Sequence, residues 1–392
     1  MTIQALSTRA VRAGIDSDPT HGAVAPPLFL SANFSFDGLG GKRRYDYTRS
    51  GNPTRDHLGE ALASLEGGAG GVITATGMGA VTLVLHALLE PGDRLLVPHD
   101  CYGGSWRLFN ALAAKGAFEL DSCDFTDVAA TAEALSRKPS LVWIETPSNP
   151  LLRITDLAAV IGAAHAAGSL VVADNTFLSP VLQRPIECGA DIVVHSTTKY
   201  INGHSDIVGG AAIARDPAVQ EQLVWWANAL GLTGSPFDSY LTLRGLRTLD
   251  ARLRIQQANC AALAEILAEE PAVGAVHYPG LANHPGHAVA ASQQDGFGAM
   301  LSFELGGGEE AVRAFVDGLR CFTLAESLGG VESLVAHPAT MTHAAMSEEA
   351  RIRAGIGPGL LRLSVGIESL DDLASDIRAG LARAACIKEL CR

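Results

Sequence analysis

The sequence of 392 residues lacks a basic excess, a long apolar run and any CxxC cysteine pair. Its formal net charge of -13 argues against nucleic acid as a partner, because phosphate contacts need a basic face. There is no run of about 18 apolar residues, so no membrane span is expected. The seven scattered cysteines indicate reduced thiols, and the first residues, MTIQALSTRAVRAG, lack the apolar stretch of a signal peptide. We therefore expect a cytoplasmic protein that binds neither nucleic acid nor a membrane.

Apolar runs of strand length alternate with helical stretches between residues 61 and 250. The runs are GVITAT (71–76), DRLLVPH (93–99), SLVWIET (140–146), SLVVADN (169–175) and ADIVVHS (190–196). Continuously apolar strands separated by helices are typical of a parallel sheet that is covered on both faces. The pattern predicts an α/β fold, in which residues 61–250 form a three-layer αβα large domain with a mostly parallel sheet.

Two further regions flank this large domain. Residues 1–60 show little periodicity and predict an extended arm, although Asn52-Pro53 has the pattern of a helix start. A long helical stretch over residues 237–270 leads into the last region, residues 251–392. Strand patterns there are FGAMLSFEL (297–305), RCFTLAE (320–326) and LLRLSVGI (360–367). Because helical patterns lie between them, we expect a smaller α+β C-terminal domain.

An acid and a lysine follow two of the predicted strands. Asp174 ends the strand SLVVAD, and Lys199 comes shortly after the next strand, DIVVHS. Ligands collect at the carboxyl ends of strands in open parallel sheets. The pair suits pyridoxal phosphate, since a lysine can bind its aldehyde covalently and a carboxylate can keep its pyridine nitrogen protonated. Taken alone, however, the two residues are more often a surface salt bridge.

A glycine turn supplies the phosphate site that such a cofactor needs. In TATGMGAV (74–81) a strand leads through this turn into a helix, so the backbone amides of Gly77 and Met78 would face an anion. The hydroxyl groups of Ser196 and Thr198 would add donors to the same phosphate. The ordinary alternative is a plain tight connection.

Two aromatic segments complete the pattern. Tyr102 follows the strand that ends near residue 99 and offers a flat face to a heterocycle. Tyr47 and Arg49, in the arm, have side chains that suit a phosphate. A core tyrosine and a solvated charge cluster are the ordinary alternatives.

Together these segments resemble the Cys/Met-metabolism family of pyridoxal-phosphate enzymes, within fold type I. The resemblance extends from Thr8 to about Ala384, and so many motifs in one order do not arise by chance. The motifs are YDYTRSGNPTRD (45–56), TATGMGA (74–80), PHDCYGGSWR (98–107), ETPSNPLL (145–152), VADNTFLSP (172–180), HSTTKYINGHSD (195–206), WWANALGLTG (225–234), FDSYLTLRGLRTL (237–249), GFGAMLSFEL (296–305), TLAESLGGVESL (323–334) and LLRLSVGIE (360–368).

The resemblance implies a role for each residue that would hold the cofactor. Lys199 is the lysine that binds it covalently, Asp174 the partner of its pyridine nitrogen and Tyr102 the residue that stacks on its ring. The other implied contacts are Gly77, Met78, Ser196 and Thr198 at the phosphate, Asn149 at the phenolic oxygen, and Tyr47 and Arg49 at the phosphate of a neighbouring subunit's cofactor. The arm over residues 1–60 would therefore contact a neighbouring subunit, in the homotetramer that is usual for the family.

The resemblance also implies the substrates, which are small amino acids. Arg362 and Ser327 match residues that hold the substrate's α-carboxylate, Asn149 is also an implied substrate contact, and Glu326 matches γ-acting members. Arg107 matches a position where a positive charge meets a distal succinyl carboxylate. The implied reaction is γ-replacement of O-succinylhomoserine or O-acetylhomoserine by L-cysteine, which forms cystathionine in methionine and transsulfuration metabolism. A small residue at position 50, Ser50, also occurs in γ-lyases, so γ-elimination of cystathionine is the alternative.

Three other function classes fit the residues less well. Gly77-x-Gly79 with Asp100 resembles part of a nicotinamide-binding motif, but Thr82 occupies its third glycine position. A non-catalytic binding protein would not need the whole set of cofactor residues. A metal enzyme would need histidines at ligand spacing, which the 12 histidines do not show, His195, His204, His337 and His343 among them.

Overall fold

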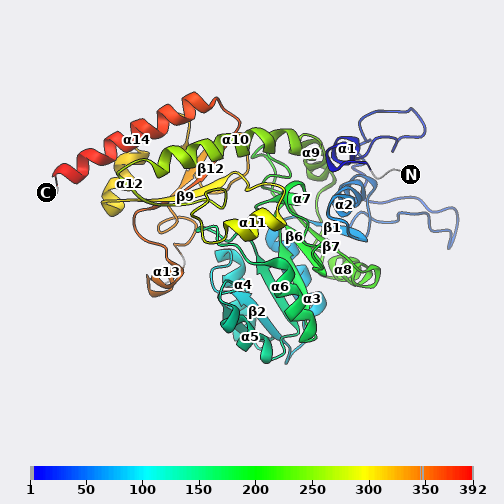
Figure 1. The fold of residues 1–392 in the computed structure, drawn as a ribbon. Coiled ribbons are helices and arrows are strands. Elements are labelled where there is room, and N and C mark those ends of the chain that lie inside the picture. The colour runs from blue at the N-terminus through cyan, green and yellow to red at the C-terminus, as the bar shows by residue number, and fades with distance from the viewer. Residues whose placement is uncertain (1–3, 345, 347, 391–392) are drawn as a thin grey trace.

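A seven-stranded sheet is the larger of two sheets in the computed structural model, which describes residues 4–344, 346 and 348–390 (Figure 1). In spatial order its strands are β1 (Gly70–Thr74), β7 (Gly210–Ala214), β6 (Ile192–His195), β5 (Leu170–Asp174), β4 (Leu141–Glu145), β2 (Arg94–Pro98) and β3 (Glu119–Cys123). Neighbouring strands are parallel except where β7 pairs with β1 and β6. The predicted mostly parallel sheet is thus confirmed.

Helices cover both faces of this sheet. Successive strand residues point to opposite faces, so a continuously apolar strand presents an apolar surface on each side. Leu141 and Trp143 of β4 belong to one hydrophobic cluster, and Val142 and Ile144 belong to another. The first cluster includes residues of α3 (Gly77–Leu88), α4 (Gly103–Ala114) and α8 (Pro217–Leu230). The second includes residues of α2 (Pro53–Glu66), α5 (Val128–Ser136) and α6 (Leu157–Ala166). These are the three layers that the sequence predicts.

The helix start at Asn52-Pro53 is also confirmed. The Asn52 side chain accepts hydrogen bonds from the backbone N–H groups of Thr54 at 3.0 Å and Arg55 at 3.4 Å. These bonds satisfy two of the donors that a helix leaves free at its first turn. Gly67 ends the helix with a φ of 83°, which glycine adopts without steric cost.

A five-stranded sheet forms the core of the C-terminal part of the chain. Its strands are, in spatial order, β10 (Thr323–Leu324), β11 (Leu334–Ala336), β12 (Leu360–Ser364), β9 (Met300–Leu305) and β8 (Val273–His277). Two helices, α12 (Gly308–Val316) and α14 (Leu370–Leu390), pack against each other beside it (Figure 1). The smaller α+β unit is thus confirmed, while the boundaries at residues 60 and 250 remain predictions.

The helical stretch over residues 237–270 is not one helix but two, α9 (Pro236–Leu246) and α10 (Leu249–Ala268). Arg252 stabilises the joint, since its side chain donates to the carbonyl of Gly245 at 3.0 Å and to Thr248 Oγ1 at 3.3 Å. A charged side chain thus serves the backbone where the helical hydrogen bonds stop. In Figure 1, α10 begins beside α9 and runs along the second sheet.

The N-terminal arm is less extended than its composition predicts, because it contains the helix α1 (Leu6–Arg12). Ala10 anchors this helix in the main hydrophobic core. Past it, the chain is largely irregular, and an isolated bridge joins Asn33 to Tyr47. The remaining helices are α7 (Ser179–Leu182), α11 (His287–Gln293) and α13 (Glu348–Ala354). No helix in the described part of the chain is long and apolar enough to span a membrane.

Candidate active site

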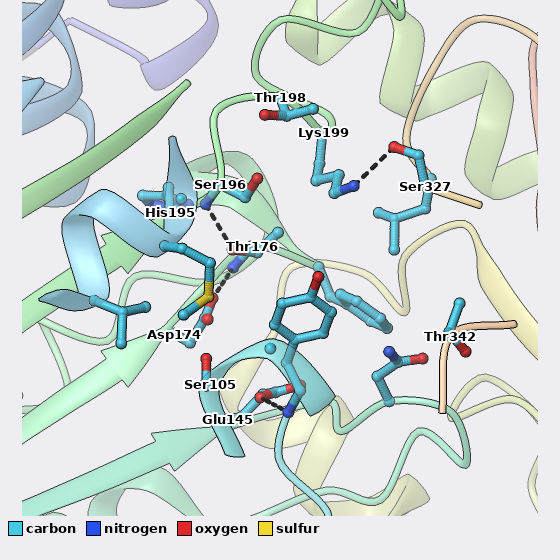
Figure 2. A pocket seen from close by; sticks show the side chains of 18 of the residues that line it. Ser105, Glu145, Asp174, Thr176, His195, Ser196, Thr198, Lys199, Ser327 and Thr342 are labelled. Atoms are coloured by element: carbon cyan, nitrogen blue, oxygen red, sulfur yellow. Dashed lines mark hydrogen bonds between the residues drawn. The ribbon is translucent and has the colours of Figure 1, made fainter. Parts of the chain in front are cut away.

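A cavity of about 460 Å³ lies at the carboxyl edge of the large sheet and is closed from the other side by residues of the C-terminal part. Figure 2 shows Lys199 and Ser327 on one side of it, with Asp174 and Glu145 on the other. The residues predicted from the sequence that line it are Gly77, Met78, Tyr102, Arg107, Asn149, Asp174, Ser196, Thr198, Lys199, Glu326, Ser327 and Arg362. The fold thus brings together side chains from both halves of the chain.

Lys199 projects into this cavity from the turn that follows β6. Its Nζ donates a hydrogen bond to Ser327 Oγ at 2.7 Å. Burial lowers the pKa of the Lys199 amine to about 8, and the charge of Arg362 acts in the same direction while Glu326 opposes it. A substantial neutral fraction of the amine is therefore present near neutral pH, as a nucleophilic lysine requires.

Ser327 has an unusual backbone conformation. Its φ of 84° lies in the left-handed region, which residues other than glycine rarely adopt. The cost of such a conformation is of order 1–3 kcal/mol, and residues that bear it concentrate at functional sites. Here the conformation belongs to the residue whose hydroxyl contacts the lysine amine.

Asp174 lies at the end of β5, where its Oδ1 accepts a hydrogen bond from the backbone N–H of Thr176 at 3.0 Å. Burial raises the pKa of this carboxyl, and the Thr176 bonds and the nearby His195 oppose the rise. His195 is itself buried and paired with Glu66, at 2.6 Å between Nε2 and Oε1. Asp174 is therefore a buried carboxyl group that lines the cavity from a strand paired on both sides, with β4 and β6.

The start of α3 forms a narrow cradle beside Ser196. A Cβ atom on Gly77 would lie 2.8 Å from the Cβ atom of Ser196, so only glycine permits this approach. Thr76 caps the helix through Gly79 N at 2.8 Å, and Thr176 Oγ1 accepts from Ser196 N at 2.9 Å. Because the first N–H groups of a helix lack intrahelical acceptors, the cradle suits an anion.

Tyr102 lies at the start of α4 with 43% of its side chain exposed to the cavity and the solvent. Its backbone N–H donates to Glu145 Oε2 at 2.8 Å. A Cβ atom on Gly104 would lie 2.5 Å from the Tyr102 ring, so this glycine leaves the room that the ring occupies. The ring thus lies over Gly104 at the cavity, while Glu145 holds the backbone of the same residue.

Arg362, on β12, is a buried arginine that faces the same cavity. Its Nη1 donates to Asn149 Oδ1 at 2.9 Å, and its Nη2 donates to the carbonyl of Ser327 at 2.9 Å. Burial lowers the pKa of the guanidinium to about 10, which leaves it charged at neutral pH. A planar cation at this place is suited to a carboxylate.

Tyr47 and Arg49 are the predicted site residues that this chain does not bring into the cavity. Arg49 Nε donates to Asn228 Oδ1 on α8 at 3.0 Å, and its guanidinium lies 5.5 Å from the centre of the Tyr47 ring. Half of the Tyr47 side chain is exposed. Within one chain, these two residues and the cavity are separate.

Comparison with known proteins identifies the family of this chain. The family model for Cys/Met metabolism PLP-dependent enzymes matches residues 7–382. The chain belongs to this family. The prediction of the family, and with it the dependence on pyridoxal phosphate, is therefore confirmed.

Three relatives illustrate the similarity. The cystathionine gamma-synthase of Escherichia coli (strain K12) is 54% identical, and the alignment covers 96% of this chain and 98% of that protein. The crystal structure of cystathionine gamma synthase from Xanthomonas oryzae pv. oryzae in complex with cystathionine is 71% identical, with a TM-score of 0.98 and coverage of 98% and 100%. That of cystathionine gamma-lyase from Lactobacillus plantarum complexed with L-serine is 39% identical, with a TM-score of 0.94 and coverage of 97% and 100%.

The cavity fits the cofactor of this family. Two buried polar atoms of its lining residues, Ser105 Oγ and Arg362 Nε, have no hydrogen-bond partner among the described residues. The cradle at Gly77 would be filled by any side chain at that position. The volume of about 460 Å³ lies within the range usual for small-molecule sites.

Sequence reasoning missed a row of polar residues on α10 that supports the site from behind. Arg252, Gln256 and Asn259 are spaced so that they share one helix face. In that order they donate to the backbone carbonyls of Ile201 at 3.4 Å, Gly330 at 2.7 Å and Gly366 at 3.1 Å. These carbonyls belong to the segments that carry Lys199, Ser327 and Arg362. The i, i+4, i+7 spacing of polar residues was the available signal.

Proposed function

We propose that this protein joins an O-acylhomoserine to L-cysteine by γ-replacement and so forms cystathionine. The observation that carries the proposal is one cavity in which the Lys199 amine lies 2.7 Å from Ser327 Oγ, with the buried Arg362 bonded to the carbonyl of the same serine. An amine beside a carboxylate-binding cation suits amino-acid chemistry. The high similarity to two cystathionine gamma-synthases favours this reaction within the family.

Pyridoxal phosphate, when bound, supplies an aldehyde that links covalently to amines and a ring that withdraws electrons from the substrate's α-carbon. Lys199 would bind the aldehyde, Asp174 would face the pyridine nitrogen and Tyr102 would lie against the ring. The residues that would hold its other groups are Gly77, Met78, Ser196 and Thr198 at the phosphate and Asn149 at the phenolic oxygen.

Lys199 is the residue that moves protons in the proposed reaction. The Lys199 amine, when not attached to the cofactor, would face the substrate's α- and β-carbons, and a pKa of about 8 suits a general base at neutral pH. Lys199 would take the α proton, give it up and then take a β proton, since an amine accepts only one proton at a time; the acyl group would then leave Cγ as its carboxylate. Cysteine thiolate forms the new Cγ–S bond, and Lys199 returns the two protons.

Four residues would surround the substrate. Arg362 would hold the α-carboxylate through its Nε and Nη groups, next to Ser327. Arg107 and Glu326 line the same cavity with exposed side chains, so they would meet the distal part of the substrate. A succinyl group carries a carboxylate there, which Arg107 would bind. An acetyl group has no such carboxylate.

A second copy of the chain would complete each site. The arm leaves large apolar side chains exposed, Leu30 by 66% among them, and α8 leaves Trp225 exposed by 63%. Exposed apolar surface of this kind marks interfaces. Tyr47 and Arg49 would then reach the phosphate in the neighbouring subunit, within a homotetramer.

The experiment offers O-succinylhomoserine and O-acetylhomoserine, each with cysteine, and separately cystathionine alone. We expect cystathionine to form from an acylated homoserine, with little breakdown of cystathionine. The second candidate, γ-elimination, is favoured by Ser50 and by the likeness to the Lactobacillus plantarum gamma-lyase. Release of 2-oxobutanoate and ammonia from cystathionine, faster than its synthesis, would decide for that activity.

A further inference from the structure

Two carboxyl groups lie side by side beneath the proposed cofactor site. Glu145 ends β4, Asp174 ends β5, and the two residues are register partners in the parallel pair. Register partners point to the same face of a sheet, and both residues line the cavity. Figure 2 shows them on the same side of the cavity, away from Lys199. Only Asp174 has a role so far, so Glu145 calls for an explanation.

The surroundings of Glu145 are acidic and buried. Its side chain is 6% exposed, and the ionisable groups around it are Asp174 on β5 and Asp100 and Cys101 in the loop after β2. Asp100 is already paired with Arg153 at 2.9 Å. Burial raises the pKa of the Glu145 carboxyl well above its usual range, and the charge of Asp174 raises it further. Two such neighbours cannot both ionise at low cost.

Asp174 is the member of the pair that is better placed to hold the charge. It accepts from the Thr176 backbone N–H at 3.0 Å, and the Thr176 hydroxyl and His195 also favour its ionised form. Glu145 has one such donor, the backbone N–H of Tyr102 at 2.8 Å. These hydrogen bonds favour the proton on Glu145 over Asp174.

We propose that Glu145 is a neutral positioning residue, which carries the single proton of the carboxyl pair and holds the Tyr102 backbone through its other oxygen. Asp174 is then the single negative charge that faces the pyridine nitrogen, and the Tyr102 ring is fixed where it contacts the cofactor. The inference rests on the proposed function in one point, the role of Asp174 toward the cofactor.

The test compares two substitutions in the holoenzyme. Glu145→Gln keeps the size of the side chain and an acceptor oxygen but cannot ionise, whereas Glu145→Leu removes the acceptor. The readouts are the pH titration of the cofactor's visible absorbance, the rate of cofactor loss and kcat/KM. We expect the Gln variant to keep the titration midpoint and a kcat/KM within about threefold. The Leu variant should lose roughly 10- to 100-fold in kcat/KM and release the cofactor faster, because a buried amide loses its partner.

Infrared spectroscopy supplies a readout that does not depend on turnover. The unsubstituted enzyme should show the C=O stretching band of a protonated carboxylic acid near neutral pH, and Glu145→Gln should remove that band. Asp376→Asn, which changes another buried carboxyl outside the cavity, should leave it in place. These measurements also decide the matter if the Leu variant does not fold.

An ionised Glu145 would give the opposite results. The Gln variant would then shift the absorbance midpoint by about one pH unit or more, or fall to the level of the Leu variant, and the infrared band would be absent. Either result overturns the inference. A protein that binds pyridoxal phosphate with these spectral properties but forms no cystathionine would refute the proposed function alone, since neither spectrum needs substrate.

Discussion

The edge of the large sheet and the N-terminal arm each supply one cation of the predicted site. The cation at the sheet edge lies in the cavity, and the cation of the arm is exposed outside it. Lys199 is held at 2.7 Å from Ser327 in a cavity, with its pKa lowered by burial. Arg49 belongs to an exposed part of the arm and contacts Asn228 on α8, outside the cavity. Lys199 thus meets its partner in the cavity of its own chain, whereas Arg49 does not reach that cavity.

The difference teaches which parts of an active site one chain can build alone. Residues at the ends of parallel strands converge because the sheet places them at one edge, whatever binds there. An arm with exposed apolar side chains has no such constraint and depends on a surface that another chain provides. If this comparison is right, a substitution at the strand ends inactivates the site of the same subunit. A substitution in the arm affects the site of the neighbouring subunit instead, so an intact arm from a partner can restore activity.

The largest effect is expected at the sheet edge, from Lys199→Ala. Loss of the amine removes both the covalent attachment and the base, so turnover should fall by at least roughly 10³-fold. The visible absorbance of the attached cofactor should disappear as well. Lys115→Ala changes an exposed lysine outside the cavity and serves as the control. A Lys199→Ala enzyme with normal absorbance would contradict the role assigned to this residue.

Next in size is Arg362→Lys, which keeps the charge but not the planar set of donors. A buried cation that loses its paired geometry costs about 3 kcal/mol, which corresponds to roughly 100-fold in KM for the amino-acid substrate. Cofactor affinity should change little, since this side chain would contact the substrate. Steady-state kinetics and cofactor titration separate the two effects. Arg313→Lys, at an exposed arginine, is the control, and an equal loss of cofactor would argue against substrate binding.

Arg49→Ala tests the arm and should have a smaller effect. Loss of a charge-assisted hydrogen bond to phosphate costs about 1.5–3 kcal/mol, so cofactor release should speed up roughly 10- to 100-fold. The control in the same arm is Arg43→Ala, which removes an exposed ion pair with Asp37.

Mixing subunits turns this variant into a direct test of the comparison. In a dimer of one Arg49→Ala chain and one Lys199→Ala chain, one site would combine an intact arm with an intact strand edge. Activity should therefore return when the two inactive or weakened proteins are mixed and allowed to exchange subunits. No recovery in a mixture that demonstrably contains hybrid dimers would show that the arm serves its own chain.

The sequence predicts most of the large sheet because five of its strands are continuous apolar runs. It does not predict β3, whose sequence ELDSC mixes polar and apolar residues at the sheet edge, or β7, whose small residues GAAIA give no strong pattern. A strand of small residues, such as β7, and a partly exposed edge strand, such as β3, depend on neighbouring strands for stability. The local sequence does not reveal those neighbours.

The candidate site also contains residues that the sequence pattern predicts and contacts that it does not. The strand-end rule finds Asp174, and the same rule applied to SLVWIE would have found Glu145, since both are acids that end apolar strands. The polar spacing on α10 singles out Gln256, but its partner, the carbonyl of Gly330, lies 74 positions away and is not identified by any local pattern. The position of the arm relative to a second chain lies outside what one chain can specify.

The smallest expected effect is the pH dependence of cofactor attachment, which should depend on the sheet edge at Lys199 and not on the arm. Attachment of the cofactor to the enzyme freed of it needs the neutral form of the Lys199 amine, whose pKa of about 8 lies below the ordinary 10.5. Roughly a tenth of the amine is neutral at pH 7, so the attachment rate should rise nearly tenfold up to about pH 8 to 9 and then level off. Stopped-flow absorbance measures this profile. Because the shift arises from burial in the cavity, Arg49→Ala should keep the same midpoint while lowering the amplitude. A rate that continues to climb toward pH 10 would show that the amine is not desolvated. A midpoint moved by Arg49→Ala would show that the charge of the arm, and not burial alone, sets the pKa of Lys199.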